Sequence, residues 1–373
     1  YTISRRGRII AAARNKRYHK RTHKFGVELP KTVKEALEID RKTGTTYWRD
    51  ALSLEIDNVK VAFDILDETD EIPPGFQKIN CHMVFDIKMG SLRRKCRLVA
   101  ASHTTDPPAS ITYASVVSRE SVRVALTIAA LNGLDVMAAD IQNAYLNSPC
   151  EEKIWTTLGP EFGPELQGKR ARIVRSLYGL KSAGASYRYH LATCMEHLGY
   201  DSCKADPDVW LRENEDHTGA KFYEYVLIYT DDILAIGKDP RNTLLRLDKY
   251  FKLKESSIGP PDVYLGAKLR QVVDKNGDKF WTQSASAYVQ EAVRNVETWL
   301  EERNLKLPSK AKTPMSTSYR PELDTSPELD AETANWYQSA IGVLRWAVEL
   351  GRVDIVTETS MLSSHMALPR EGH

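Results

Sequence analysis

Cysteine is scarce in this sequence, and its spacing excludes two kinds of stabilising framework. The five cysteines are Cys81, Cys96, Cys150, Cys194 and Cys203. They form no Cys-x-x-Cys pair and no Cys/His array, which are the spacings of structural zinc sites. The sequence therefore predicts neither a structural zinc nor a disulfide framework, and it fits a reducing compartment.

Long apolar runs and a signal peptide are lacking as well. No run approaches the roughly 20 apolar residues that a membrane-spanning helix needs, and no secretory leader opens the chain. We therefore expect neither contact with a membrane nor secretion. The chain begins with Tyr1 and stops at His373, and both ends are expected to be cuts through a longer polypeptide.

A large excess of one charge is absent, because the net charge is only +2 at pH 7. Positive charge is nevertheless concentrated in residues 1–24, which carry many basic side chains and no acidic one. This basic arm could contact phosphates or could be a solvated linker, and the sequence favours neither.

Length and composition are those of an ordinary globular protein. A chain of 373 residues is long enough for two or three compact units, and 42% hydrophobic with 27% charged residues is typical of soluble domains. Apolar periodicity and turn residues predict these elements: a basic hairpin over 81–101 turning at Gly90-Ser91, a helix from Ser118 to Gly133, a strand over 136–141, a helix ended by Gly199, a helix opened by Asp239-Pro240, a hairpin that starts at 263–269 and turns at 275–278, helices near 286–304 and 333–350, and a linker over 306–330.

The most informative stretch is 229–237, where two adjacent aspartates separate two apolar runs. The runs predict strands, and Asp tolerates turns, so the stretch predicts a hairpin with Asp231 and Asp232 at its tip. Adjacent ionised carboxylates repel each other, and a bound divalent cation relieves that cost. Taken alone, the pair is explained more readily as a solvated hairpin tip.

Asp140 supplies a third carboxylate at the end of the strand predicted over 136–141. If that strand neighbours the Asp231-Asp232 hairpin in an antiparallel sheet, three carboxylates converge at one sheet edge. Magnesium prefers oxygen ligands and shares them with substrate phosphates. Two such ions can clamp the attacking and leaving oxygens of a phosphoryl displacement.

Five motifs occur in a specific order along the chain. They are Phe85-Asp86-Ile87-Lys88 through Lys95-Cys96-Arg97-Leu98-Val99-Ala100, Asp140-Ile141-Gln142-Asn143-Ala144-Tyr145-Leu146-Asn147, Leu177-Tyr178-Gly179-Leu180-Lys181, Tyr229-Thr230-Asp231-Asp232-Ile233-Leu234, and Tyr337-Gln338-Ser339-Ala340-Ile341-Gly342-Val343-Leu344 with Arg352-Val353-Asp354-Ile355. From about residue 30 to its end, the chain thereby resembles the reverse transcriptase domain of copia-type long-terminal-repeat retrotransposon Pol polyproteins.

The resemblance implies an α+β fold, the right hand of a polymerase, with fingers, a palm bearing an antiparallel sheet and a helical thumb or connection. It divides the chain into a basic arm (1–24), fingers and the start of the palm (25–135), the palm (136–283) and the thumb or connection (284–373). The palm would hold a fingers insert at about 150–185 and a primer-grip-like hairpin, and the chain would stop before a ribonuclease H segment.

The resemblance also implies a role for individual residues. Asp140, Asp231 and Asp232 would be catalytic and would hold two Mg²⁺ ions, for which Mn²⁺ could substitute, and the backbone carbonyl of Ile141 could also coordinate. The other implied residues are Lys95, Arg97, Tyr145, Lys181 and Ser182 for the deoxynucleoside triphosphate, and Tyr264, Leu265 and Gly266 for the primer. The ring of Tyr145 would exclude a ribose 2′-hydroxyl by steric clash. Lys95 and Arg97 could instead belong to an exposed basic strand, and the 264–266 hairpin could be ordinary core.

The implied function is RNA-directed DNA synthesis by a two-metal nucleotidyltransferase. Its partners would be an RNA template, a DNA primer and product, deoxynucleoside triphosphates and the rest of the Pol polyprotein. Its setting would be a cytoplasmic virus-like particle, with the nucleus as a second compartment.

Several positions depart from the family pattern, and two alternatives therefore stay open. Ser182 stands where Gln usually follows Gly-Leu-Lys, Thr230 replaces Val and Cys96 replaces Ala. Such drift favours a catalytically inactive relic that binds nucleic acid or assembles with a partner, whereas the intact Asp140, Asp231 and Asp232 argue against it. An RNA polymerase on the same palm is the third possibility, which the ring of Tyr145 disfavours.

Overall fold

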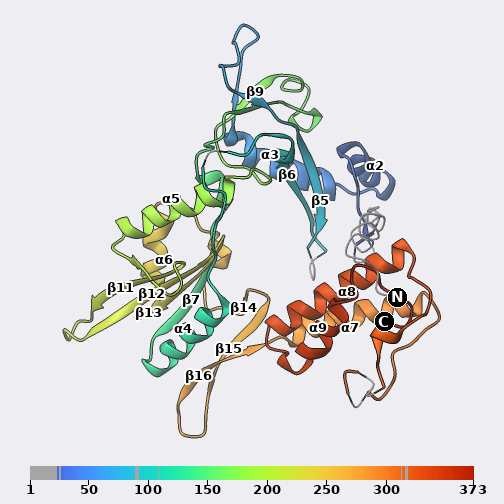
Figure 1. The fold of residues 1–373 in the computed structure, drawn as a ribbon. Coiled ribbons are helices and arrows are strands. Elements are labelled where there is room, and N and C mark those ends of the chain that lie inside the picture. Colours follow the sequence, from blue (N-terminus) through green and yellow to red (C-terminus); the bar gives the residue numbers. More distant parts are fainter. Residues whose placement is uncertain (1–22, 25–26, 89–91, 109, 312, 316–317) are drawn as a thin grey trace. The chain divides into compact units, whose positions relative to one another are not determined.

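The structure, a computed structural model, describes residues 23–24, 27–88, 92–108, 110–311, 313–315 and 318–373. The chain forms two compact units, which comprise Arg21–Pro261 and, in the described C-terminal part, Asp262–His373 (Figure 1). The turn predicted at Gly90-Ser91 and almost all of the basic arm 1–24 lie outside the described residues.

The first unit contains a long hairpin with two helices and a small sheet packed around one core. Its elements are β1 His23–Lys24, β2 Val27–Glu28, α2 Val33–Thr43, α3 Tyr47–Val59, β3 Phe63–Ile65, β4 Gln77–Lys78, β5 Cys81–Ile87, β6 Arg94–Ala100, β8 Ile154–Thr157 and β9 Arg170–Ile173. Met83, Phe85 and Ile87 alternate with outward residues along β5 and are buried, as the two-residue period of a strand requires. Trp48 of α3 meets the ring of Phe85 edge-on at 5.6 Å. The predicted basic hairpin is thus confirmed as β5–β6.

A five-stranded antiparallel sheet, in the order β10-β11-β12-β13-β7, forms the other half of this unit (Figure 1). Its strands and the helices beside them are β7 Asp135–Asp140, β10 Asp201–Ser202, β11 Val209–Glu215, β12 Lys221–Tyr229, β13 Asp232–Gly237, α4 Arg119–Leu131, α5 Ala183–His197 and α6 Pro240–Asp248. Helix α4 lies on one face of the sheet, and α5 and α6 lie on the other. Because both faces are covered, β13 is an almost continuous apolar run.

The helix starts predicted from capping residues are confirmed. The Ser118 hydroxyl accepts a hydrogen bond from the backbone N–H of Ser121 at 3.1 Å, and the Asp239 carboxylate accepts one from Asn242 at 3.0 Å. The strand predicted over 136–141 is β7, and the mixed fold of sheets and helices is also confirmed.

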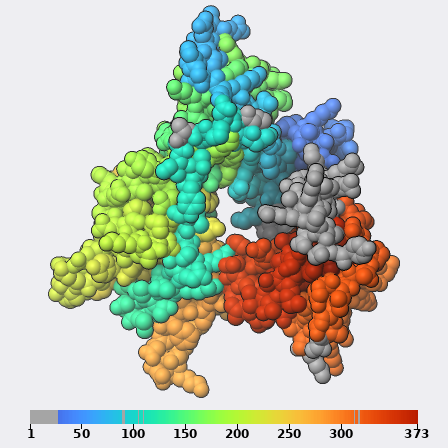
Figure 2. All heavy atoms as spheres, viewed as in Figure 1, coloured from blue at the N-terminus to red at the C-terminus, as the bar shows by residue number. Residues whose placement is uncertain are grey.

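The second unit combines a three-stranded sheet with helices. Its elements are β14 Val263–Tyr264, β15 Ala267–Val273, β16 Lys279–Ser284, α7 Ser286–Glu301, α8 Ala331–Glu349 and α9 Val356–Ser363. Trp299 of α7 stacks on Trp336 of α8 with ring centroids 3.9 Å apart. The β15–β16 hairpin, drawn in orange, projects away from these helices (Figure 2). Its predicted turn at 275–278 and the helices predicted near 286–304 and 333–350 are confirmed.

One predicted strand is wrong in detail, because the run over 263–269 is not continuous. Leu265 and Gly266 both have positive φ angles, 49° and 82°, and they form a tight turn between β14 and β15. A Cβ at Gly266 would lie 3.3 Å from Nε1 of Trp346 on α8. The turn therefore packs closely on α8, which places this hairpin in the second unit.

Single-turn 3₁₀ helices join several elements in the described part of the chain: η1 Lys60–Ala62, η2 Ser102–Thr104, η3 Ala144–Asn147, η4 Pro160–Phe162, η5 Glu255–Ser257, η6 Pro321–Leu323 and η7 Val353–Ile355. Of these, η3 follows β7 directly. Asn143, at φ 52°, supplies the left-handed residue that turns the chain into it.

A buried charge network fastens the five-stranded sheet to α6. The carboxylate of Glu224 on β12 accepts hydrogen bonds from Tyr200 at 2.8 Å, from Arg212 at 2.6 Å, from Arg246 on α6 at 3.2 Å and from Asn214 at 3.0 Å. Its side chain is only 6% exposed. Both guanidinium groups are paired with this one carboxylate, so its removal leaves two part-buried positive charges uncompensated.

We predict that Glu224→Ala lowers the free energy of unfolding by about 3–5 kcal/mol, because breaking a buried ion pair leaves its partners desolvated and unpaired. Urea denaturation followed by circular dichroism measures the loss. Glu213→Ala is the matched control, since it breaks an exposed pair with Lys221 on the same sheet and should cost no more than about 1 kcal/mol. Equal losses in the two variants would contradict this role for Glu224.

Candidate active site

The three predicted carboxylates meet at one end of the five-stranded sheet. Asp140 ends β7, Asp232 begins β13, and the two are direct partners in the antiparallel pairing. Asp231 lies in the turn between β12 and β13, which Thr230 enters with a φ of 56°. The backbone N–H of Ile141 donates to the carbonyl of Asp231 at 2.7 Å, so the turn is tied directly to β7.

Asp140 and Asp232 are close enough to share a hydrogen bond, and their pKa values are shifted in opposite directions. Burial, the hydrogen bond to Asp140 and the negative charges of Asp231 and Asp140 raise the pKa of Asp232 to about 7. Burial would also raise the pKa of Asp140, but the hydrogen bond and charge of Lys254 outweigh it and lower that pKa. Below about pH 7 the pair therefore holds one proton between two carboxylates.

Lys254 is a member of this site that the sequence analysis missed. Its Nζ donates to Oδ2 of Asp140 at 2.8 Å. Exposed and buried residues alternate here, with Phe251 and Leu253 buried. This alternation shows only that Lys252 and Lys254 face outward. Nothing in the local sequence predicts that this segment pairs with β7, because that pairing joins residues 114 positions apart.

Two predicted basic residues lie on β6 with their side chains outside the core. Cys96, Leu98 and Ala100 face the core, and Lys95 and Arg97 occupy the alternate positions. Burial and the charge of Arg97 lower the pKa of Lys95, whereas the negative charge of Asp231 acts in the opposite direction. Lys95 therefore lies within electrostatic reach of the carboxylates.

Tyr145 belongs to an aromatic cluster with Tyr178, a second site residue to which the sequence analysis gave no role. Its ring meets Tyr178 edge-on at 4.9 Å and Tyr187 at 5.8 Å. The guanidinium of Arg97 lies over the Tyr178 ring, 4.5 Å from its centroid. Tyr178 was part of a recognised motif, but only the fold shows that it joins Tyr145 to Arg97.

The structure does not bring Lys181 and Ser182 into this cluster. Lys181 Nζ donates to the carbonyl of Thr105 at 2.6 Å, and Ser182 Oγ donates to Glu152 at 2.7 Å. Ser182 is 1% exposed. Both side chains thus tie loops together, and their role toward a nucleotide stays a prediction. Tyr264, Leu265 and Gly266 form the β14–β15 turn of the second unit, and their role toward a primer also stays a prediction.

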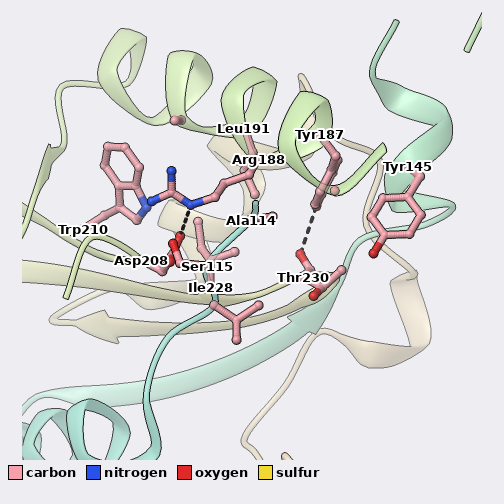
Figure 3. Close-up of a pocket in the computed structure, with 13 residues that line it drawn as sticks. Ala114, Ser115, Tyr145, Tyr187, Arg188, Leu191, Asp208, Trp210, Ile228 and Thr230 are labelled. Carbon is pink, nitrogen blue, oxygen red and sulfur yellow. Dashed lines mark hydrogen bonds and ion pairs between the residues drawn. The ribbon is translucent and has the colours of Figure 1, made fainter. Parts of the chain in front are cut away.

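A cavity of about 110 Å³ adjoins the carboxylate end of the sheet. It lies between α5, the strands β11 and β12 and the extended segment 114–116 (Figure 3). The hydroxyl of Tyr187 donates to the carbonyl of Thr230 at 3.0 Å on its wall. Arg188 Nε, also on the wall, donates to Asp208 Oδ1 at 2.9 Å, and the other oxygen of this buried carboxylate has no hydrogen-bond partner among the described residues.

The described residues contain no ready-made cluster of three or more His, Cys, Asp or Glu side chains that could hold a metal ion. The donor chemistry of Asp140, Asp231 and Asp232 nevertheless fits a hard divalent cation, because carboxylate oxygens are its preferred ligands. Lys254 and a proton on Asp232 compensate part of the negative charge of these three carboxylates. Within the part of the chain that the structure describes, no helix is long and apolar enough to span a membrane.

A family model and individual relatives of this chain agree on one protein family. The family model described as reverse transcriptase (RNA-dependent DNA polymerase) matches residues 67–302. The chain is 28% identical over 320 residues to the Retrovirus-related Pol polyprotein from transposon TNT 1-94 of Nicotiana tabacum, covering 81% of this chain and 23% of that protein. It is 24% identical to the corresponding RE2 polyprotein of Arabidopsis thaliana, covering 96% of this chain and 23% of that protein.

A shorter relative and a solved structure complete the comparison. The putative transposon Ty5-1 protein of Saccharomyces cerevisiae is 28% identical over 238 residues, covering 63% of this chain and 71% of that protein. The chain thus spans about a quarter of the plant polyproteins and matches most of this shorter relative. A telomerase structure from Candida albicans aligns with a TM-score of 0.34 and 9% identity, covering 84% of this chain and 59% of that one, and is too distant to support a conclusion.

The raised pKa of Asp232 predicts a pH-dependent stability in the presence of a chelator. The folded state keeps a proton up to about pH 7, whereas the unfolded chain loses it near the ordinary value of 3.8. The contribution of this group to stability is therefore fully present below about pH 4, falls as pH rises toward 7 and is constant above. Asp232→Asn should remove the fall, so its melting temperature should gain on wild type between pH 5 and pH 8. A constant difference across that range would contradict the shared proton.

Proposed function

The chain belongs to the reverse transcriptase (RNA-dependent DNA polymerase) family, and we propose that it catalyses template-directed DNA synthesis. The primer 3′-hydroxyl would attack the α-phosphate of a deoxynucleoside triphosphate, and pyrophosphate would leave. The observation that supports this most directly is the pairing of Asp140 with Asp232, beside Asp231, at one end of an antiparallel sheet. Phosphoryl transfer needs positioning and charge compensation at such a point rather than a covalent nucleophile.

Asp140, Asp231 and Asp232, with the carbonyl of Ile141, would hold two magnesium ions, for which manganese could substitute. When bound, these ions would increase the acidity of the primer hydroxyl and stabilise the pyrophosphate. The protein's own contribution is the rigid frame, since the register of β7 with β13 and the hydrogen bond from Ile141 to Asp231 fix the backbone of all three carboxylates. Rigidity matters because small displacements at a reacting centre cost large factors in rate.

We assign Lys95 and Arg97 to the triphosphate and Tyr145 to the sugar. Both cations lie on the outward face of β6, and Arg97 is oriented by its contact with the Tyr178 ring. Tyr145 is supported on its edges by Tyr178 and Tyr187, so its ring cannot easily move aside for a larger sugar. A supported ring discriminates by steric clash, which an open apolar pocket does poorly.

The cavity beside Thr230 is assigned to the template strand. It adjoins the residue before Asp231, and the guanidinium of Arg188 on its wall is part-exposed, so that the N–H groups beyond its Nε bond to Asp208 would be the donors to a phosphate. We assign the β14–β15 turn to the primer. We also propose that the chain is divided into fingers, palm and thumb, as in the right hand of a polymerase. Binding through backbone phosphates would be salt-dependent and largely independent of sequence. The expected setting is a Pol polyprotein in a cytoplasmic virus-like particle, with the nucleus as a second compartment.

Primer extension tests the proposal directly. The chain is given a poly(rA) template with an oligo(dT) primer, dTTP and magnesium, beside the Asp231→Asn, Asp232→Asn double variant and the Glu213→Gln control. We expect extension by the wild type and the control and a loss of at least about a thousandfold in the double variant, because the charge compensation at the phosphate is lost. A folded wild type that binds the hybrid but does not extend it would contradict the proposal and favour the inactive relic.

The role of Tyr145 predicts a change in sugar selectivity. Tyr145→Ala should raise the use of ribonucleotides relative to deoxynucleotides by about tenfold or more, because the ring that meets the 2′-hydroxyl is removed. Tyr145→Phe keeps the ring and its contacts with Tyr178 and Tyr187, and it should keep the wild-type ratio. The measurement is the ratio of kcat/KM for dTTP and UTP, and an unchanged ratio in Tyr145→Ala would contradict the assignment.

A further inference from the structure

The segment 252–259, which carries Lys254, is fixed along the free edge of β7. The N–H of Lys254 donates to the carbonyl of Asp140 at 2.9 Å, and the N–H of Gln142 donates to the carbonyl of Lys252 at 2.8 Å. Ala138 and Gly259 exchange two further backbone bonds, of 2.8 and 3.1 Å. The backbone around Lys254 is therefore hydrogen-bonded to β7 much as a neighbouring strand would be.

The side chain of Ser257 also links the backbone of Asp140 to that of Lys254. The Ser257 hydroxyl accepts from the N–H of Asp140 at 2.8 Å and donates to the carbonyl of Lys254 at 2.6 Å. Leu253, which is 1% exposed, anchors the same segment in the core. Asp140 and Lys254 thus keep a fixed backbone separation, and only their side chains can change partners.

The ion pair itself is accessible, in contrast to its backbone. The side chains of Lys254 and Asp140 are 42% and 38% exposed. Pairs of this exposure contribute little to stability and exchange partners readily. The ammonium nevertheless contacts an oxygen of the carboxylate that the proposed function assigns to a metal ion, and a lysine has no lone pair with which to join such an ion as a ligand when it is charged.

We propose that Lys254 is a built-in counter-ion of the carboxylate site, which a divalent cation must displace from Asp140. The proposal rests on the proposed function, because it takes Asp140 to be a metal ligand. Without metal, the ammonium compensates the carboxylate end of the sheet. When a cation binds, the side chain of Lys254 swings away on its fixed backbone, and the carboxylate exchanges one positive partner for another.

Competition of this kind has a definite consequence for affinity. A positive charge that must be displaced weakens the binding of the free cation, so the site takes metal best when the metal arrives with anions such as a nucleoside triphosphate. Removal of the ammonium leaves the carboxylates uncompensated and should strengthen the binding of the free cation. A purely structural lysine, by contrast, would leave metal affinity unchanged or weaken it.

Binding of Mn²⁺ in the absence of nucleotide tests the proposal, with the free ion measured by electron paramagnetic resonance. Lys254→Met, which keeps the length of the side chain, should lower the Kd for Mn²⁺ by roughly fivefold or more, since the charge lies in direct contact with the ligand. Lys252→Met is the matched control: it removes the same charge from the same segment, but among the described residues the ion pair of Asp140 is with Lys254 and not with Lys252. It should leave the Kd unchanged.

Two further variants keep the outcome decisive. Lys254→Gln also removes the positive charge and should show the same gain in affinity, so the comparison remains if Lys254→Met fails to fold. An unchanged or weaker affinity in folded Lys254→Met, or an equal gain in Lys252→Met, would overturn the proposal. Asp140→Asn should lose this binding in either background. If it does not, the metal-site assignment of the proposed function fails, and the two failures are thereby distinguished.

Discussion

Repulsion among three carboxylates held at one end of a sheet is the constraint around which this structure is arranged. The pairing of β7 with β13 brings Asp140 against Asp232, and the turn adds Asp231. The backbone that carries both residues cannot move far, because it is hydrogen-bonded to its neighbours. The negative charge must therefore be compensated in place, by a proton on Asp232, by Lys254 or by bound cations.

The rest of the first unit supports that arrangement. Two cores support the site: one beneath the β5–β6 hairpin carries the cationic strand, and one between the sheet and α5–α6 carries the carboxylates. Tyr145 packs against both cores, and Tyr187 joins α5 to the turn through the carbonyl of Thr230. The aromatic cluster thus packs between the residues assigned to the nucleotide and those assigned to the metal.

The sequence predicted the elements whose signals are local and missed the contacts that depend on long-range pairing. Capping residues located α4 and α6, and apolar runs with turn residues located β5, β6 and β7, because each pattern is set by neighbours in the chain. Lys254 was missed because its partner Asp140 is brought to it only by the fold. The break at Leu265-Gly266 was missed because a non-glycine residue with positive φ is uncommon. Motif resemblance named Lys181 and Ser182, but it could not show that both side chains are used to hold loops.

Anomalous scattering at the manganese edge, from crystals of the chain with a template–primer, a nonreactive nucleotide and Mn²⁺, tests the central claim most directly. We predict anomalous peaks within coordination distance of Asp140, Asp231 and Asp232, with the Lys254 ammonium no longer in contact with Asp140. Manganese bound elsewhere, or a Lys254–Asp140 pair that persists beside an occupied nucleotide site, would contradict the view that these carboxylates exchange an internal counter-ion for catalytic metal.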